Sequence, residues 1–195
     1  MKRAMDVVLS ALGILLTAPL LMLIALAIKL TSRGPVLFRQ QRVGRNFEPF
    51  YICKFRTMIP DAPQCGAQIT AGADPRITRL GHWLRRSKLD ELPQLWNVLV
   101  GEMSLVGPRP EVPKYVEMFH DDFREVLSVR PGITDPASVR FRDESALLGQ
   151  SENPERTYVE DILPAKIALA KEYIARSGVW YDLKLMIETL LRVAR

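Results

Sequence analysis

The chain has 195 residues and a formal net charge of +5. This length suits one domain with a hydrophobic core, or a compact domain together with a membrane segment. The two cysteines, Cys53 and Cys65, and the two histidines, His82 and His120, show no metal-binding spacing. A disulfide framework, a zinc site and a His-dependent nucleophile therefore have little support, and a reducing compartment is favoured.

Arginine contributes 19 of the 27 basic residues. Its planar guanidinium binds phosphate through two parallel hydrogen bonds, so this bias favours phosphorylated ligands or anionic lipid. An ordinary basic surface explains the composition equally well.

The first thirty residues contain a membrane candidate. Val7 to Ile28 is a run of 22 residues without a charge. As a helix it would reach roughly 33 Å, enough to cross a bilayer. A cleaved signal peptide, a single-pass helix and a re-entrant helix compete, and the first is disfavoured because the run is long and lacks a cleavage site.

Charge and a proline favour the re-entrant helix. A single span would export one of two basic clusters, against the positive-inside tendency. Pro19 removes a helix hydrogen bond near the middle of the run, so we expect a helix broken at Ala18-Pro19 that enters and leaves on one side. A kinked full span is the alternative. The basic clusters are Lys2 and Arg3 before the run, and Lys29, Arg33, Arg39, Arg42 and Arg45 after it.

We assign residues 1–32 to this membrane helix and 33–195 to one compact domain, in an α+β, mostly helical fold. A short β-hairpin is predicted from strands at 35–40 and 50–55, with a turn at 44–46. Residues 60–75 are rich in Pro, Gly and Ala and predict a mobile loop. Helical periodicity follows at 78–86, 91–100, 112–123 and 167–174.

The last helix has an apolar stripe. Its position suits either core packing, which we favour, or an amphipathic helix in the membrane interface. Trp180 and Tyr181 just before it could anchor at the headgroup layer. The stripe consists of Leu183, Met186, Ile187, Leu190 and Leu191.

The chemistry is concentrated around Asp90 and Glu91. Pro93 does not fit deep inside a helix, so a helix should begin close to these residues and place Asp90 at or near its N-cap. Backbone N–H groups there would keep the Asp90 carboxylate ionised, as a carboxylate nucleophile requires. Glu91 lies about 100° further round the helix, so the two carboxylates should diverge and have different roles. A simple cap and a first-turn charge explain such a pair equally well.

Cations surround this pair in the sequence. Such groups could hold a diphosphate and a developing phosphoryl charge, although each one could also be a solvated surface residue. The candidates are Lys54, Arg56, Arg85, Arg109 and Arg142. No Walker loop or GxGxxG spacing occurs, and a carboxylate-bound Mg²⁺ would be another way to neutralise phosphate.

Taken in order, the motifs resemble the monotopic phosphoglycosyl transferases, bacterial sugar transferases that start glycan assembly on polyprenol phosphate. The matching stretches span most of the chain. They are Lys2 to Asp6, PVLFRQQRVG at 35–44, KFRTM at 54–58, LRRSKLDELPQL at 84–95, NVLVGEMSLVGPRP at 97–110 and RPGIT at 130–134.

The resemblance implies a small, catalytic-domain-only form at the cytoplasmic face of the bacterial inner membrane. Asp90 would attack the β-phosphate of a UDP-sugar, releasing UMP and leaving an aspartyl phosphosugar that undecaprenyl phosphate then attacks. Glu91 would complete the catalytic pair and Mg²⁺ would sit against Asp90. Lys54, Arg56, Arg85, Arg109 and Arg142 would bind substrate. The implied partners are UDP-sugar, undecaprenyl phosphate and membrane lipid, with no nucleic acid, and a homodimer is compatible.

The sequence departs from the family pattern at two places. Ala18 stands where the family has Ser before the helix-breaking proline, and the segment 135–142 differs from the run that many relatives have after RPGIT. The identity of the sugar therefore cannot be inferred from the resemblance. A membrane-anchored, non-enzymatic binder of anionic lipid or polyanion is the alternative function, and it leaves the clustered carboxylates unexplained.

Overall fold

The computed structural model describes residues 1–62, 69–141 and 143–193. Within these ranges the chain is mostly helical with two pairs of short strands, which confirms the predicted α+β class. The elements in chain order are α1 (Lys2–Thr31), β1 (Leu37–Val43), η1 (Arg45–Phe47), β2 (Pro49–Phe55), α2 (Arg79–Arg86), η3 (Leu89–Glu91), α3 (Gln94–Val100), β3 (Ser104–Val106), α4 (Pro113–Met118), α5 (His120–Val126), β4 (Gly132–Thr134), α6 (Pro136–Arg140), α7 (Glu144–Gly149), α8 (Pro154–Thr157), η4 (Tyr158–Ile162), α9 (Leu163–Arg176) and α10 (Val179–Val193).

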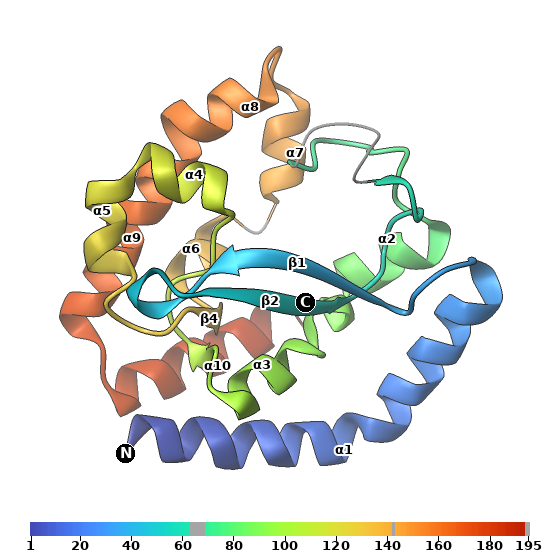
Figure 1. The fold of residues 1–195 in the computed structure, drawn as a ribbon, viewed down its shortest axis with the longest axis horizontal. Helices are drawn as coiled ribbons and strands as arrows, with labels where there is room; N and C mark the ends of the chain where they lie inside the picture. Colours follow the sequence, from blue (N-terminus) through green and yellow to red (C-terminus); the bar gives the residue numbers. More distant parts are fainter. Residues whose placement is uncertain (63–68, 142, 194–195) are drawn as a thin grey trace.

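The predicted hairpin is confirmed. β1 and β2 pair antiparallel, with Leu37 opposite Phe55 and Val43 opposite Pro49, while β3 and β4 form a short parallel pair. The hairpin crosses the middle of the molecule, with α4, α5 and α9 on one side and α1, α3 and α10 on the other (Figure 1). The end of β2 is thereby brought close to η3, the turn that carries Asp90.

Two of the hydrophobic core clusters hold helices around the hairpin. The larger one joins α4, α5, η4 and α9. The second joins the C-terminal part of α1 to β2 and α2 through Ile28, Phe55 and Leu84. Full burial of an aliphatic or aromatic side chain of this size contributes about 1.5–3 kcal/mol, so α1 is an integral part of the domain.

Helix α1 continues through Pro19, so the predicted break at Ala18-Pro19 is not confirmed. Its ribbon bends partway along (Figure 1), as expected when a proline removes one backbone hydrogen bond and crowds the preceding turn. The most apolar 18-residue window has a mean hydropathy of 2.6, and 11% of it is buried. A core helix would be mostly buried, so the outward face needs another apolar environment. Its exposed residues include Val8, Leu12, Leu15, Leu16, Leu23, Leu26 and Leu30.

Charged side chains attach the beginning of α1 to the domain. Lys2 pairs with the buried carboxylate of Asp182 in α10. Arg3 donates to two backbone carbonyls of α3. Asp6 accepts hydrogen bonds from the hydroxyl of Ser104 at 2.9 Å and from the next backbone N–H at 3.1 Å. We call these contacts the N-terminal anchor. Lys2 and Arg3 were predicted to flank the membrane segment, and in the structure both bind groups of the domain.

Two predicted helices differ in the structure. The 112–123 pattern forms two helices, α4 and α5, because the backbone leaves the helical region at Phe119. In α10 the assignment of the apolar stripe to the core is wrong for Leu183, Ile187 and Leu191, which are exposed, whereas Met186 packs against a core cluster that contains Leu185. Trp180 is 84% exposed.

Part of the predicted loop at 60–75, residues 63–68 with Cys65 among them, lies outside the described ranges. The structure describes the loop on both sides of this part. The described part contacts the domain through Gly72, whose N–H donates to the carbonyl of Ser145 at 2.6 Å. The mobility of the loop stays a prediction.

Candidate active site

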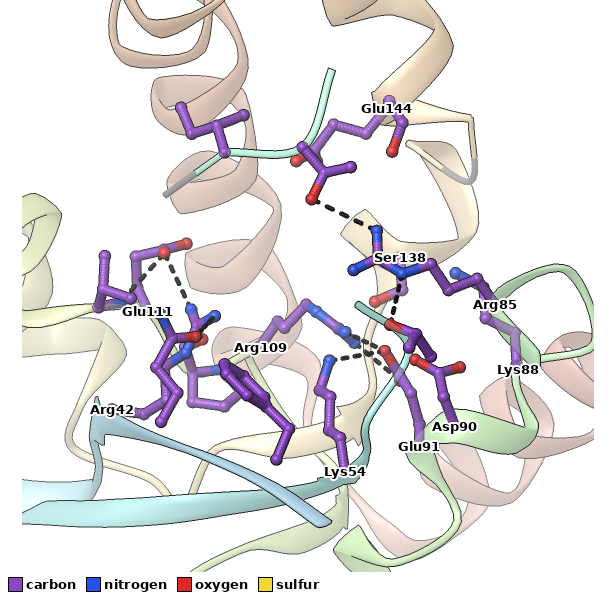
Figure 2. A pocket seen from close by; sticks show the side chains of 18 of the residues that line it. Arg42, Lys54, Arg85, Lys88, Asp90, Glu91, Arg109, Glu111, Ser138 and Glu144 are labelled. Carbon is purple, nitrogen blue, oxygen red and sulfur yellow. Dashed lines mark hydrogen bonds and ion pairs between the residues drawn. The ribbon is translucent and has the colours of Figure 1, made fainter. Parts of the chain in front are cut away.

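A cavity of about 1810 Å³ lies between the hairpin, η3 and the helices α6, α7 and α9. The two predicted catalytic residues line it with four of the five predicted cations: Asp90, Glu91, Lys54, Arg56, Arg85 and Arg109. The fifth cation, Arg142, lies outside the described residues. The sequence motifs therefore converge on one site (Figure 2).

Glu91 is held by two cations. The Nζ atom of Lys54 lies 2.9 Å from Oε1, and the guanidinium of Arg109 binds both carboxylate oxygens. Figure 2 shows the two side chains converging on Glu91 from β2 and from the segment after β3. Burial alone would raise the pKa of Glu91, but Arg109 and Lys54 hold it well below its usual range. Glu91 therefore stays ionised and keeps both cations in place.

The pKa values of the two cations that bind Glu91 are also shifted. Burial lowers the pKa of Lys54 to about 8, although Glu91 opposes the shift. Glu91 raises the pKa of Arg109 above its usual value. Lys54 is thus the cation of the pair whose charge responds to mildly alkaline pH.

Asp90 has a different environment from its neighbour. Its residue surface is 8% exposed, and Oδ1 is buried without a hydrogen-bond partner. Burial and the charge of Glu91 raise the pKa of Asp90, while Lys54, Lys88 and Arg85 oppose the shift. The two carboxylates therefore have different surroundings, since only Glu91 is engaged by Lys54 and Arg109; their separate roles stay a prediction.

The predicted N-cap role of Asp90 is wrong. Asp90 lies in the 3₁₀ turn η3, and Pro93 occupies the N-cap position of α3 without a side-chain bond. Lys88 begins the turn in the left-handed region at φ 57°, a conformation that costs a non-glycine residue about 1–2 kcal/mol. Asp90 is therefore directed into the cavity by this strained turn and not by the end of a helix.

Asn97 fixes the turn relative to the hairpin. Its Oδ1 accepts from the backbone N–H of Cys53 at 3.0 Å, and its Nδ2 donates to the carbonyl of Tyr51 at 2.8 Å. The side chain is 1% exposed. Because Cys53 precedes Lys54, Asn97 helps to position Lys54 relative to Glu91. Asn97 begins the matching stretch at 97–110, but this role was not predicted for it.

Arg85 is oriented by hydroxyl groups. Its Nε donates to Thr57 Oγ1 at 2.9 Å, and Nη1 lies 3.4 Å from Thr70 Oγ1 (Figure 2). No carboxylate among the described residues accepts a hydrogen bond from it, so the guanidinium keeps its charge available for an anionic ligand.

Asp135 is a positioning residue that sequence reasoning missed. Its Oδ2 accepts from the backbone N–H of Arg109 at 3.2 Å, and Oδ1 accepts from the N–H of Ser138 at 2.7 Å. It thereby caps α6 and aligns Arg109. The sequence Asp135-Pro136, an N-cap followed by a proline at the first helical position, was a signal that could have identified this helix start.

A second polar group lines the cavity away from Asp90. Arg42 donates to Glu111 Oε1 at 3.2 Å, and the hydroxyl of Tyr158 donates to Glu111 Oε2 at 2.7 Å. Tyr158 begins η4, a π-helical turn of the kind that often marks functional sites. Sequence reasoning placed Arg42 in the membrane flank and did not connect it with the site.

The carboxylates of the described residues form no cluster of three or more metal-ligating groups. A divalent cation held by one carboxylate and by substrate phosphates is compatible with the free Oδ1 of Asp90, since Mg²⁺ keeps several of its waters. The arrangement can present a carboxylate to a phosphoryl group while guanidinium and ammonium groups balance the charge.

Comparison with known proteins gives a consistent result. The model of the family described as "Bacterial sugar transferase" matches residues 1–195. The chain is 43% identical over 198 residues to the undecaprenyl-phosphate glucose phosphotransferase of Komagataeibacter xylinus, covering 98% of this chain and 35% of that protein. It is 44% identical over 194 residues to the UDP-glucose:undecaprenyl-phosphate glucose-1-phosphate transferase of Caulobacter vibrioides, covering 97% and 68%.

The exopolysaccharide production protein PSS of Rhizobium leguminosarum bv. phaseoli is 37% identical over 198 residues, covering 98% of this chain and 94% of that protein. The chain thus spans little more than a third of the Komagataeibacter protein and nearly all of the Rhizobium one. The match of the family model along the whole chain, together with these identities, shows that the chain belongs to the bacterial sugar transferase family.

Proposed function

We propose that this protein transfers a sugar 1-phosphate from a UDP-sugar to undecaprenyl phosphate, giving undecaprenyl-diphospho-sugar and UMP, as the first membrane step of glycan assembly. The relatives named above support the reaction class. The observation that carries the proposal is the buried, unpartnered Oδ1 of Asp90 beside the ion-paired Glu91.

In the first step an oxygen of the Asp90 carboxylate attacks the β-phosphorus of the UDP-sugar. The bond between that phosphorus and the bridging oxygen breaks, and UMP leaves with the electron pair. In the second step a phosphate oxygen of undecaprenyl phosphate attacks the same phosphorus, and Asp90 leaves as a carboxylate. A carboxylate that is not already held by cations suits both steps.

Glu91 acts through the cations that it holds. An ionised Glu91 fixes Lys54 and Arg109 beside the position where the phosphates would lie. These groups, with Arg85, are well placed to stabilise the charge that develops on the phosphoryl oxygens. The ion pairs also leave Glu91 no free oxygen in this state for taking a proton.

Mg²⁺ would bind at Asp90 together with the diphosphate of the donor. When bound, it would neutralise phosphate charge and favour departure of UMP. The free oxygen of Asp90 fits this role, and the engaged oxygens of Glu91 do not.

We further propose that α1 is re-entrant and that the domain lies on the cytoplasmic face of the bacterial inner membrane. Both ends of α1 bind the same domain: Lys2 binds Asp182, and Ser32 at the other end accepts from Arg56. A helix with both ends on one domain would have both ends on one side of the bilayer. Its exposed leucines and the exposed face of α10 would then be in contact with lipid.

The test is UMP release by the protein in nanodiscs with undecaprenyl phosphate, Mg²⁺ and a panel of UDP-sugars. UDP-glucose comes first because two relatives are named for glucose transfer. UMP release with one donor, lost in Asp90→Asn, is the expected result. No release with any donor, while the protein still binds membranes, would favour the non-enzymatic alternative.

A further inference from the structure

The proposed function requires two substrates of different polarity to reach the same aspartate. The nucleotide sugar is soluble, whereas the acceptor carries its phosphate on an apolar chain in the bilayer. The cavity has walls of two corresponding kinds. One part carries the polar side chains Arg42, Glu111, Ser138 and Tyr158.

The other part lies where α1 ends and β1 begins. Its lining is apolar and includes Pro35, Val36, Leu37, Met58 and Ile59. Three of these residues, Pro35, Leu37 and Ile59, are exposed. The second core cluster attaches this region to the C-terminal part of α1. In Figure 1 the chain runs from the C-terminal end of α1 directly into β1, so this region is the part of the cavity next to the end of the apolar helix.

Arg56 is the buried cation of this apolar part. It is 7% exposed and lines the cavity. Its Nη2 donates to the carbonyl oxygen of Ser32 at 3.1 Å and to the hydroxyl at 2.6 Å. Its Nε and Nη1 are buried and have no hydrogen-bond partner. No carboxylate pairs with Arg56 among the ion pairs of the described residues, so a buried positive charge has no counter-charge.

Such an arrangement is costly without a ligand. Buried guanidinium groups are normally paired with an anion, because desolvating a charge costs several kcal/mol. Gly34 lets the guanidinium of Arg56 approach the backbone closely: a Cβ at position 34 would lie 2.3 Å from Nη1, and φ of Gly34 is 108°. The unpartnered donors of this buried, cavity-lining guanidinium beside apolar residues indicate a site for an anion.

We propose that Arg56 binds the phosphate of the polyprenyl phosphate acceptor, whose chain leaves over the apolar lining toward α1. This inference rests on the proposed function and assigns the acceptor a subsite separate from Arg85 and Arg109. Arg56 lies two residues beyond Lys54 on the same chain segment, which brings the acceptor phosphate toward Asp90 from the membrane side.

The experiment separates the two half-reactions in nanodiscs of neutral lipid. The first readout is the burst of UMP from the active UDP-sugar without acceptor. The second is the rate of transfer as a function of undecaprenyl phosphate concentration. The variants are Arg56→Gln, Arg56→Lys and, as a matched control, Arg79→Gln, an exposed arginine at the start of α2.

Arg56→Gln is expected to leave the UMP burst unchanged and to raise the KM for undecaprenyl phosphate at least about tenfold, as loss of a charge-assisted contact predicts. Arg56→Lys should lie between wild type and Arg56→Gln, and Arg79→Gln should behave as wild type. The burst itself shows that each variant is folded.

Three results would overturn the assignment. Loss of the burst in Arg56→Gln would place Arg56 in donor binding or in folding, and an unchanged KM would remove it from acceptor binding. Inorganic phosphate and phosphatidylglycerol are also added as competitors. If either competes as well as undecaprenyl phosphate in the wild type, the subsite recognises free phosphate or bulk anionic lipid instead. Absence of any burst in the wild type would reject the proposed function, a separate outcome.

Discussion

Two regions of this molecule bury charge in opposite ways. In the N-terminal anchor the buried carboxylate of Asp182 pairs with Lys2 and accepts from the hydroxyl of Tyr173 at 2.7 Å. Asp6 accepts from a side chain and from the backbone. Neither aspartate has a buried oxygen without a partner.

The cavity leaves hydrogen-bonding groups unused. Among the described residues, the buried side-chain atoms without a partner belong to Arg42, Arg56, Asp90, Gln94 and Ser138, and all except Gln94 line the cavity. A fold that only had to be stable would satisfy these groups, as the anchor does. The contrast indicates that the anchor holds α1 and that the cavity is shaped for ligands.

The strongest test of this contrast is Asp90→Asn. An amide oxygen is a poor nucleophile and cannot form the phosphoryl intermediate, so UMP release should fall by about 10³-fold or more. The free energy of unfolding should stay the same or increase, because a buried charge is removed. Asp161→Asn, an exposed site in η4, is the control. Substantial turnover in Asp90→Asn would reject Asp90 as the nucleophile.

Glu91→Gln should lower activity less than Asp90→Asn does, and it should lower stability more. The change leaves Lys54 and Arg109 without their counter-charge, so we expect about 10²-fold slower turnover and a loss of unfolding free energy of about 3 kcal/mol. Rates are measured with saturating Mg²⁺, and stability by thermal unfolding in detergent. Glu152→Gln, at an exposed position, is the control. Normal activity in Glu91→Gln would show that Glu91 is only a charge at the end of a turn and that the reaction does not need it.

The anchor should show the reverse pattern. Asp182→Asn removes the charge that Lys2 binds, and we expect a loss of about 1–3 kcal/mol, limited because the Lys2 side chain is 37% exposed. Turnover of the folded protein should stay within about twofold of wild type, since Asp182 is outside the cavity lining of the described residues. A loss of turnover without a loss of stability would contradict the division between anchor and cavity.

The sequence predicted the elements better than their ends. Two short strand-like runs on either side of the turn at 44–46 were sufficient to predict the hairpin, and side chains of both strands pack in core clusters. Apolar periodicity did not reveal whether a stripe faces the core, so the outer face of α10 was assigned incorrectly. A lipid-facing stripe and a core-facing stripe have the same composition.

The site could be predicted as a set of residues but not as a geometry. Motifs identified Asp90, Glu91 and the cations, since these residue types suit phosphate chemistry. The strained turn at Lys88, the bridge through Asn97 and the cap by Asp135 were not predicted. Each depends on contacts between segments distant in the sequence, which local patterns do not contain.

The smallest predicted effect concerns the pH dependence set by Lys54. Burial lowers the pKa of Lys54 to about 8, so the ammonium group loses its proton as pH rises through that value. Below it Lys54 is charged and can pair with Glu91 and a phosphate; above it the cavity loses one positive charge. The rate of transfer should therefore fall on the alkaline side with an apparent pKa of about 8.

Lys54→Arg tests this assignment, because the guanidinium keeps its charge far above pH 8. We expect a lower rate at pH 7, since the longer fork alters the contact with Glu91, and a nearly flat profile between pH 7 and 9. Lys114→Arg, at a half-exposed lysine outside the cavity lining of the described residues, should retain the wild-type fall in rate on the alkaline side. If Lys54→Arg also retained it, the titrating group would lie elsewhere, and the charge of Glu91 would be balanced by Arg109 alone.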